Sequence, residues 1–195
     1  MSLTKDELAY LRSFRDNIDN DNVKLKQQIK RKLLDDKYII HVLNNKELEE
    51  SEAEPDDYFG VNILPYYMLL DNTQTNVKNY ICFETRVDYN YRYQASAMKA
   101  QLIIFHILCD IKEIIDKDTS LARHDLLAAL ITNMFNYGIF LGGRFQLIAD
   151  IPDAVDRYYC SRTLTFRQET DINLVKTING KPKIINHDIG EATQI

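Results

Sequence analysis

The amino-acid sequence predicts an α+β fold: an antiparallel sheet that contains a long β-hairpin, with helices packed on one face of the sheet. Apolar residues recur at helical spacing between residues 23 and 34 and again between 123 and 137. Between these segments, residues 80–110 hold two stretches with the composition and alternation of β-strands. Paired strands grouped around one long helix, without regular strand–helix alternation, are typical of such an α+β arrangement.

The composition is that of a folded, soluble domain. The chain has 195 residues, of which 45% are hydrophobic and 27% charged, with a net charge of −5. This length suffices for one domain with a core, and a mildly acidic chain is not expected to bind nucleic acid generally. The sequence shows no apolar leader and no run of ~20 apolar residues, so we expect an intracellular protein without a membrane partner. The three cysteines lie far apart in apolar runs, which favours reduced, buried thiols.

The N-terminal part is expected to be helical. Residues 3–16 form a short helix in which Thr4 and Glu7 have the spacing of a capping box. The polar run 16–22 interrupts the helix, because short polar side chains compete for backbone hydrogen bonds. A second helix is expected from residue 23, and a further short helix over residues 38–43.

Two segments that precede the hairpin are expected to be irregular. Residues 47–57 are acidic and contain Pro55, which is typical of a solvated loop. Residues 61–67 contain Pro65, which disfavours a central strand and favours an extended segment.

The hairpin is the clearest prediction. Its first strand starts at Tyr80, and from Phe83 onward its residues alternate between two faces. One face holds Phe83, Thr85, Val87, Tyr89, Tyr91 and Tyr93; the other holds Glu84, Arg86, Asp88, Asn90 and Arg92. The apolar segment Met98–Asp110 is expected to be the second, more buried strand.

The C-terminal half adds a helix and two strands. Residues 123–137 predict an amphipathic helix with Ser120 as its N-cap and Gly138 as its stop. Strands are expected at 145–149 and 158–166, joined by a loop that holds Pro152 and Asp153. Residues 174–178 and 183–185 could form a small hairpin around Asn179-Gly180.

These boundaries divide the chain into three parts. Residues 1–22 form an N-terminal helical extension and residues 23–173 an α+β core domain. Residues 174–195 form a C-terminal extension, either mobile or docked on a partner.

No motif for catalysis or for cofactor binding is found, so we expect neither an enzyme nor a bound cofactor. The four histidines lie in different predicted elements, at His41, His106, His124 and His187, and no metal-ligand spacing occurs. The best enzyme alternative is a metal-dependent nuclease that uses Asp71, Glu84 and Arg86. A solvated sheet face with cross-strand charge pairs explains Glu84 and Arg86 equally well.

Assembly with other proteins is the more plausible task of the hairpin. Tyr89, Tyr91 and Tyr93 are amphipathic aromatics that could be core residues or could meet another subunit. We predict an interface made of these three tyrosines together with further charged residues. The charged residues are Arg86 and Arg92 of the hairpin and Asp56 and Asp57 of the acidic loop.

The layout resembles that of bacteriophage head–tail joining and tail-terminator proteins, a family of tail-completion and neck proteins. The resemblance covers about residues 23–173 and rests on the order of the elements and on general sequence character, without an invariant motif. The matching pieces are Ile29–Leu43, Tyr80-Ile-Cys-Phe-Glu-Thr, Ala100–Cys109, Arg123-His-Asp-Leu-Leu-Ala-Ala-Leu-Ile-Thr-Asn-Met-Phe and Arg162-Thr-Leu-Thr-Phe. The N-terminal helix and the extension after residue 173 are longer than is usual in this family.

The resemblance implies a structural virion protein that forms a homo-oligomeric ring, expected to be a hexamer, at the head–tail junction. Its partners would be other phage tail, neck or connector proteins, and it would be assembled in the host cytoplasm. DNA would pass through such a ring without specific binding, which suits a mildly acidic chain. The alternative is an oligomeric adaptor protein of mobile-element origin.

Overall fold

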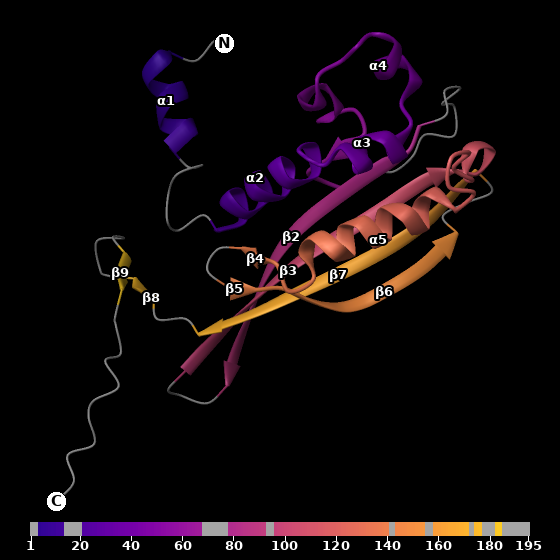
Figure 1. Cartoon of the computed structure of the whole chain (residues 1–195). Helices are drawn as coiled ribbons and strands as arrows, with labels where there is room; N and C mark the ends of the chain where they lie inside the picture. The colour runs from indigo at the N-terminus through magenta and orange to yellow at the C-terminus, as the bar shows by residue number, and fades with distance from the viewer. Residues whose placement is uncertain are drawn as a thin grey trace, which may run out of the picture.

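The computed structural model describes residues 4–13, 21–67, 78–92, 96–140, 143–154, 158–171, 174–176 and 182–184 (Figure 1). The helices are α1 (Lys5–Ser13), α2 (Asp21–Leu34), α3 (Lys37–Leu43), α4 (Lys46–Glu50) and α5 (Arg123–Phe135), with short 3-10 helices η1 (Pro55–Tyr58) and η2 (Ile111–Glu113). The strands are β1 (Ile63–Leu64), β2 (Tyr80–Arg92), β3 (Ser96–Asp110), β4 (Ile139–Phe140), β5 (Gly143–Arg144), β6 (Gln146–Ala154), β7 (Tyr159–Asp171), β8 (Leu174–Lys176) and β9 (Pro182–Ile184).

Five strands form the main sheet, in the order β1-β2-β3-β7-β6. All neighbouring strands are antiparallel except β1, which runs parallel to β2. The predicted hairpin is β2–β3, which pairs without interruption from Tyr80↔Leu108 to Arg92↔Ser96. Figure 1 shows its far end projecting beyond the helices, so the sheet is longer than the layer that covers it.

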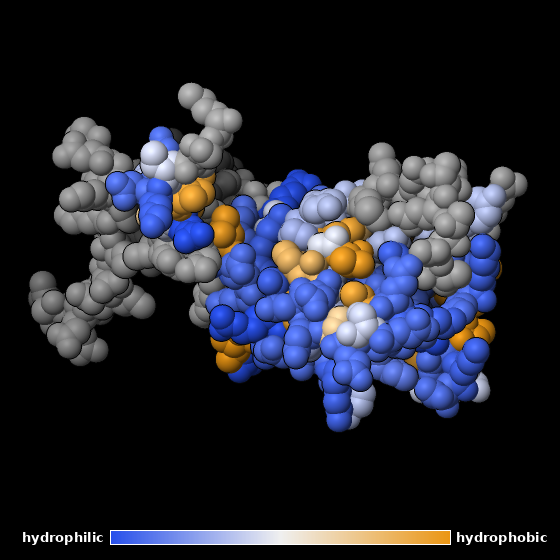
Figure 2. Space-filling model, turned by 90° about the horizontal axis from the view of Figure 1, so that it is seen from above, coloured by the Kyte–Doolittle hydropathy of each residue, from blue (hydrophilic) through white to orange (hydrophobic). Residues whose placement is uncertain are grey.

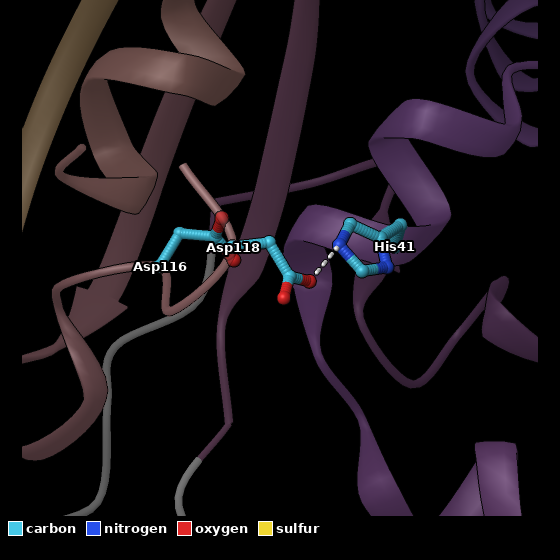
Figure 3. Close-up of side chains that lie close together, drawn as sticks. All are labelled: His41, Asp116 and Asp118. Carbon is cyan, nitrogen blue, oxygen red and sulfur yellow. Dashed lines mark ion pairs between the residues drawn. The ribbon is translucent and has the colours of Figure 1, made fainter. Parts of the chain in front are cut away.

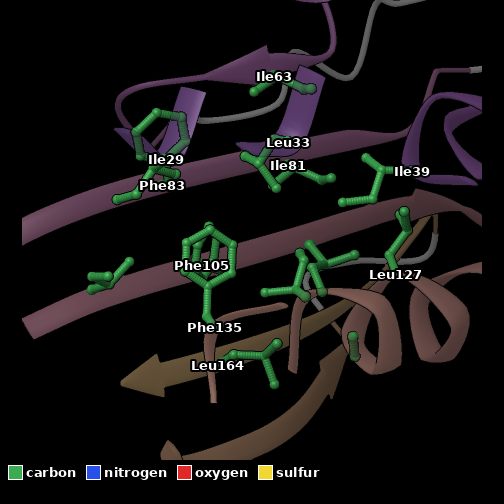
Figure 4. Packing of buried hydrophobic residues seen from close by; sticks show 14 of the residues in the cluster. Ile29, Leu33, Ile39, Ile63, Ile81, Phe83, Phe105, Leu127, Phe135 and Leu164 are labelled. Carbon is green, nitrogen blue, oxygen red and sulfur yellow. The ribbon is translucent and has the colours of Figure 1, made fainter. Parts of the chain in front are cut away.

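The core lies between the sheet and the helices α2, α3 and α5, all on one face of the sheet. Each of these helices buries an apolar stripe, and Phe83 and Phe105 point toward them from β2 and β3 (Figure 4). Phe105 is the centre of an aromatic cluster, with its ring centroid 4.9 Å from that of Phe135 and 5.9 Å from that of Phe166. The predicted α+β fold, with helices on one face, is therefore confirmed.

Local sequence signals explain several helix ends. The capping box of α1 forms as predicted: the Thr4 amide donates to the Glu7 carboxylate at 2.7 Å, and the Glu7 amide to the Thr4 hydroxyl at 3.3 Å. At α3, the Asp36 carboxylate accepts from the amides of Tyr38 and Ile39. The helix ends at Asn44, whose φ of 50° lies in the left-handed region that Asn tolerates.

Three local predictions need correction. The helix α5 has Ala122 rather than Ser120 as its N-cap: the Ala122 carbonyl accepts from the amides of Asp125 and Leu126, both at 3.0 Å, whereas Ser120 lies in the preceding turn, where its amide donates to the Asp116 carbonyl at 2.8 Å. Pro152 and Asp153 lie within the edge strand β6 and not in a loop, since an edge position tolerates the missing amide hydrogen of proline. The acidic segment 47–57 is solvent-exposed as expected, but it contains most of α4 and the start of η1.

The remaining predictions have mixed outcomes. The small C-terminal hairpin is confirmed by the pairing of β8 with β9, whereas its turn, Asn179-Gly180, lies outside the described residues. The three cysteines form no disulfide; Cys82 and Cys109 are buried, and Cys160 is half-buried opposite Cys109 on β7. Burial raises the pKa of the Cys109 thiol, which keeps it protonated and unreactive. No helix among the described residues is long and apolar enough to cross a membrane.

Candidate assembly surface

The two faces of the main sheet differ in what covers them. The register places Phe83, Phe105 and Leu164 on the face that carries the helices. Side chains on the opposite face are aligned in rows across the strands: Cys82, His106, Thr163 and Ile151; Glu84, Ile104, Thr165 and Ala149; Arg86, Leu102, Arg167 and Gln146. Apart from Cys82, these side chains are half-buried or exposed. We call them the outer face of the sheet.

The outer face is partly apolar, and its first row carries an aromatic contact at His106. The ring of Tyr67 lies 4.5 Å from the ring of His106, measured between centroids, and His106 Nδ1 is 3.2 Å from the Thr163 hydroxyl. Burial lowers the pKa of His106, although the charge of Glu84 acts in the opposite direction. His106 is therefore a half-buried side chain whose neutral form is favoured, rather than an exposed cation.

The two edges of the sheet are not equally protected. On the side of β6, a bulge between Leu147 and Ala149 and the proline at 152 interrupt the regular row of backbone donors. Bulges and edge prolines are devices that prevent pairing with another strand. On the other side, β1 pairs only with Ile81 and Cys82 of β2.

The outer edge of β2 continues well past β1. The Ile81 amide donates to the Asn62 carbonyl at 2.8 Å, so the amide of Ile81 points away from β3. Because backbone direction alternates along a strand, the amides of Phe83, Thr85 and Val87 point to the same side. Within the described residues, no strand pairs with this part of the edge.

Only some of the predicted interface residues have described side chains. Arg86 is exposed on the outer face, whereas Tyr89, Tyr91 and Arg92 are described only as backbone positions of β2, opposite Lys99, Ala97 and Ser96. Tyr93 lies outside the described residues.

Asp56 and Asp57 belong to η1, next to α2. Asp56 lies 3.6 Å from Lys30 of α2, and the Asp57 carboxylate accepts from the Glu54 amide at 3.0 Å. These two carboxylates therefore bind neighbours on the helical side of the molecule, away from the outer face.

One side-chain cluster has the composition of a metal site. His41, Asp116 and Asp118 place their ligand atoms within 4.8 Å of one another (Figure 3). Both oxygens of Asp116 are already engaged, by Arg123 at 3.0 Å and by the amide and hydroxyl of Thr119 at 3.0 and 2.8 Å. His41 and Asp118 form an exposed ion pair at 3.3 Å. Protein contacts alone thus explain the cluster.

Arg123 is the polar centre of this end of the molecule, and sequence reasoning missed it. It is 5% exposed, and its guanidinium donates to the carbonyls of Val42 and Glu113, both at 3.1 Å, besides its ion pair with Asp116. Burial would raise the pKa of Asp116, but the hydrogen bonds from Thr119 and the charge of Arg123 lower it overall. The arrangement ties the start of α5 to the end of α3.

Three buried asparagines form a second hydrogen-bond network at this end of the molecule. Asn45 donates to Asn62 at 2.6 Å, Asn62 to the Asn79 carbonyl at 2.8 Å, and Asn79 to the Leu43 carbonyl at 2.9 Å. These partners are 17 to 36 residues apart in the chain, so no local pattern could have revealed them. The network joins α3, the turn before β1 and the start of β2, and its role is structural.

A second arginine holds the other side of α5. Arg162 of β7 donates two hydrogen bonds to Asp150 of β6, at 2.6 and 2.8 Å, and a third to Asp125 of α5. These contacts, led by the hydrogen bond to Asp150, raise the pKa of Arg162. Both carboxylates neutralise the guanidinium, so it is not an open anion site.

Fold and surface together define a small α+β protein whose sheet carries α2, α3 and α5 on one face, while the outer face is partly apolar and half-exposed. A family model, YomW, matches residues 36–168, more than half of the chain, and the chain therefore belongs to the YomW family. The family name is phage-derived, of the SPbeta type, and suggests a phage-associated protein. The match supports the phage association but not the specific tail-terminator family. No curated protein matches the chain.

Proposed function

We propose that this protein is a non-enzymatic structural component of a phage particle, and that it assembles with copies of itself into a closed ring at the head–tail junction. Membership of a phage-associated family supports the phage context. Tail terminators and neck proteins are the specific classes proposed, with tail or connector proteins as partners. The virion is the proposed location.

The open outer edge of β2 carries the proposal. An unpaired edge with an outward amide at every second residue is a template for another strand, and monomeric proteins normally protect such edges. Here the β6 edge is protected, whereas no strand among the described residues pairs with the outer edge of β2 beyond β1. The half-exposed outer face beside it adds apolar area at the same place, through side chains such as Ile104 and Leu102. A ring uses such surfaces in heterologous contacts, in which one patch meets a different patch on the next subunit.

Light scattering over a concentration series tests the assembly, with Val87→Pro as the decisive variant. Proline at 87 removes an outward amide but no hydrogen bond to β3, so the subunit should stay folded while the ring is lost. Val87→Ala keeps the amide hydrogen and is the control. A ring of unchanged mass in Val87→Pro would refute a role for this edge. A wild-type protein that stays monomeric at all concentrations would favour an adaptor.

A further inference from the structure

The helix α1 is well formed but buries none of its residues. Its capping box is complete, yet Leu8 and Leu11, which share a face at i and i+3, are 39% and 52% exposed. Figure 2 shows α1 as the coloured group on the left, with hydrophobic atoms open to solvent. A helix of nine residues is marginal in water and needs a surface against which to pack.

A groove of matching character lies between α2, the start of α3 and the end of α5. Its volume is about 1010 Å³, and its floor is apolar: Leu130, Met134, Ile139 and Phe140. Ile139 is 70% exposed and Leu130 and Met134 are half-buried, whereas Phe140 belongs to the core, so the floor is partly open to solvent. A helix the length of α1, about 14 Å, suits an open groove of this kind better than a small molecule does.

The charges of the groove and of α1 are complementary and set a direction. The groove wall carries Arg31, Lys32 and Lys37 against Asp35 and Asp36, a net positive charge, while the first turn of α1 carries Asp6 and Glu7 against Lys5, a net negative charge. Asp36 on the same wall caps α3, so its carboxylate is already engaged. The acidic start of α1 would therefore face the basic end of α2, with the two helices antiparallel.

We propose that α1 of one copy docks in the groove between α2 and α5 of a second copy, with Leu8 and Leu11 on the apolar floor. Within one subunit α1 has no buried residue and the floor of the groove stays partly open, as expected for a donor and an acceptor that meet only on assembly. The contact is heterologous, because each copy donates one helix and accepts another, and such contacts can close into a ring. This interface rests on the ring assembly proposed above.

Complementation between two defective variants tests the interface. Leu8→Glu/Leu11→Glu spoils the donor and Ile139→Glu the acceptor; both change exposed side chains, so circular dichroism should show wild-type folding and melting. Each variant alone should have the mass of a monomer in light scattering. An equimolar mixture should give a species of twice that mass, because one intact helix meets one intact groove. Ala9→Glu, which places one negative charge on the opposite side of α1, should keep the wild-type mass, and Leu8→Glu alone is the variant of equal charge to compare with it.

Other outcomes separate this interface from the ring itself. If the wild type forms a ring and the donor variant forms the same ring, the helix–groove contact is refuted and the ring stands. If both variants are monomeric but their mixture gives no larger species, the contact between copies is refuted. Residues 14–20 span up to about 25 Å, so α1 would then be expected to fold back on its own subunit. A monomeric wild type would refute the ring and the contact together.

Discussion

Ile104 and Phe105 are neighbours on β3, but they lie on opposite faces of the sheet and in different environments. Phe105 is fully buried among other aromatic rings under α5, whereas Ile104 is half-buried on the outer face between Glu84 and Thr165. The covered face holds the molecule together because its apolar area is removed from water. The outer face contributes less to the fold, and its apolar side chains remain available for another protein.

The largest effect is expected on the covered face. Phe105→Ala should lower the free energy of unfolding by about 3–5 kcal/mol, because it removes an aromatic ring from a packed cluster and leaves a cavity. Ile104→Ala, one residue away, should cost only about 1 kcal/mol. Urea denaturation of both variants measures the difference. Equal losses would mean that the outer face is as well packed as the core.

A smaller effect is expected in the buried asparagine network on the helical side. Asn62→Ala should cost about 1–3 kcal/mol, since it leaves the Asn45 amide and the Asn79 carbonyl without partners in a buried place. Asn133→Ala, an exposed position on α5, is the control and should change stability by no more than about 0.5 kcal/mol. Thermal unfolding followed by circular dichroism suffices. A wild-type melting temperature for Asn62→Ala would show that the network is dispensable.

The smallest effect on stability is expected on the outer face, at His106, and it depends on pH. The pKa of His106 is lowered by burial from 6.5, so the unfolded chain binds a proton more readily than the folded one. The stability that depends on His106 should therefore be fully present above pH 6.5 and should be lost as the pH drops below that value toward the pKa of the folded state. His106→Gln removes this contribution, so the variant's stability should fall less than that of the wild type between pH 7 and the pKa of the folded state.

Urea midpoints measured at several pH values check this prediction, with the difference between the two curves as the readout. The acidic groups titrate in both proteins and cancel in that difference. Parallel curves for wild type and variant would mean that His106 is solvated, and hence that Tyr67 does not shield the outer face.

Assembly provides a third way to sharpen the contrast between the faces. If the outer face and the β2 edge serve the ring, substitutions there should change the mass in solution more than the stability. Core substitutions such as Phe105→Ala should do the reverse.

The local patterns of the sequence predicted most of the fold. Alternation from Phe83 onward and the apolar run Met98–Asp110 specified the β2–β3 hairpin, and helical spacing specified α2 and α5. The capping box at Thr4 and Glu7 was predicted and formed. Each of these features depends on residues a few positions apart, and short-range sterics and hydrogen bonds decide them.

Only the tertiary structure decided which side chains form the polar clusters and which edges and surfaces are exposed. Arg123 reads as a helix-start residue in the sequence, but its partner at Val42 is 81 residues away. The edge position of β6, and the absence of a described strand beside most of β2, follow from strand order, which periodicity does not encode. The position of Asp56 beside Lys30 of α2 likewise depends on packing between segments that are distant in the chain. Burial, edges and grooves arise where distant segments meet, so the sequence by itself determined the elements and their folding determined the surfaces.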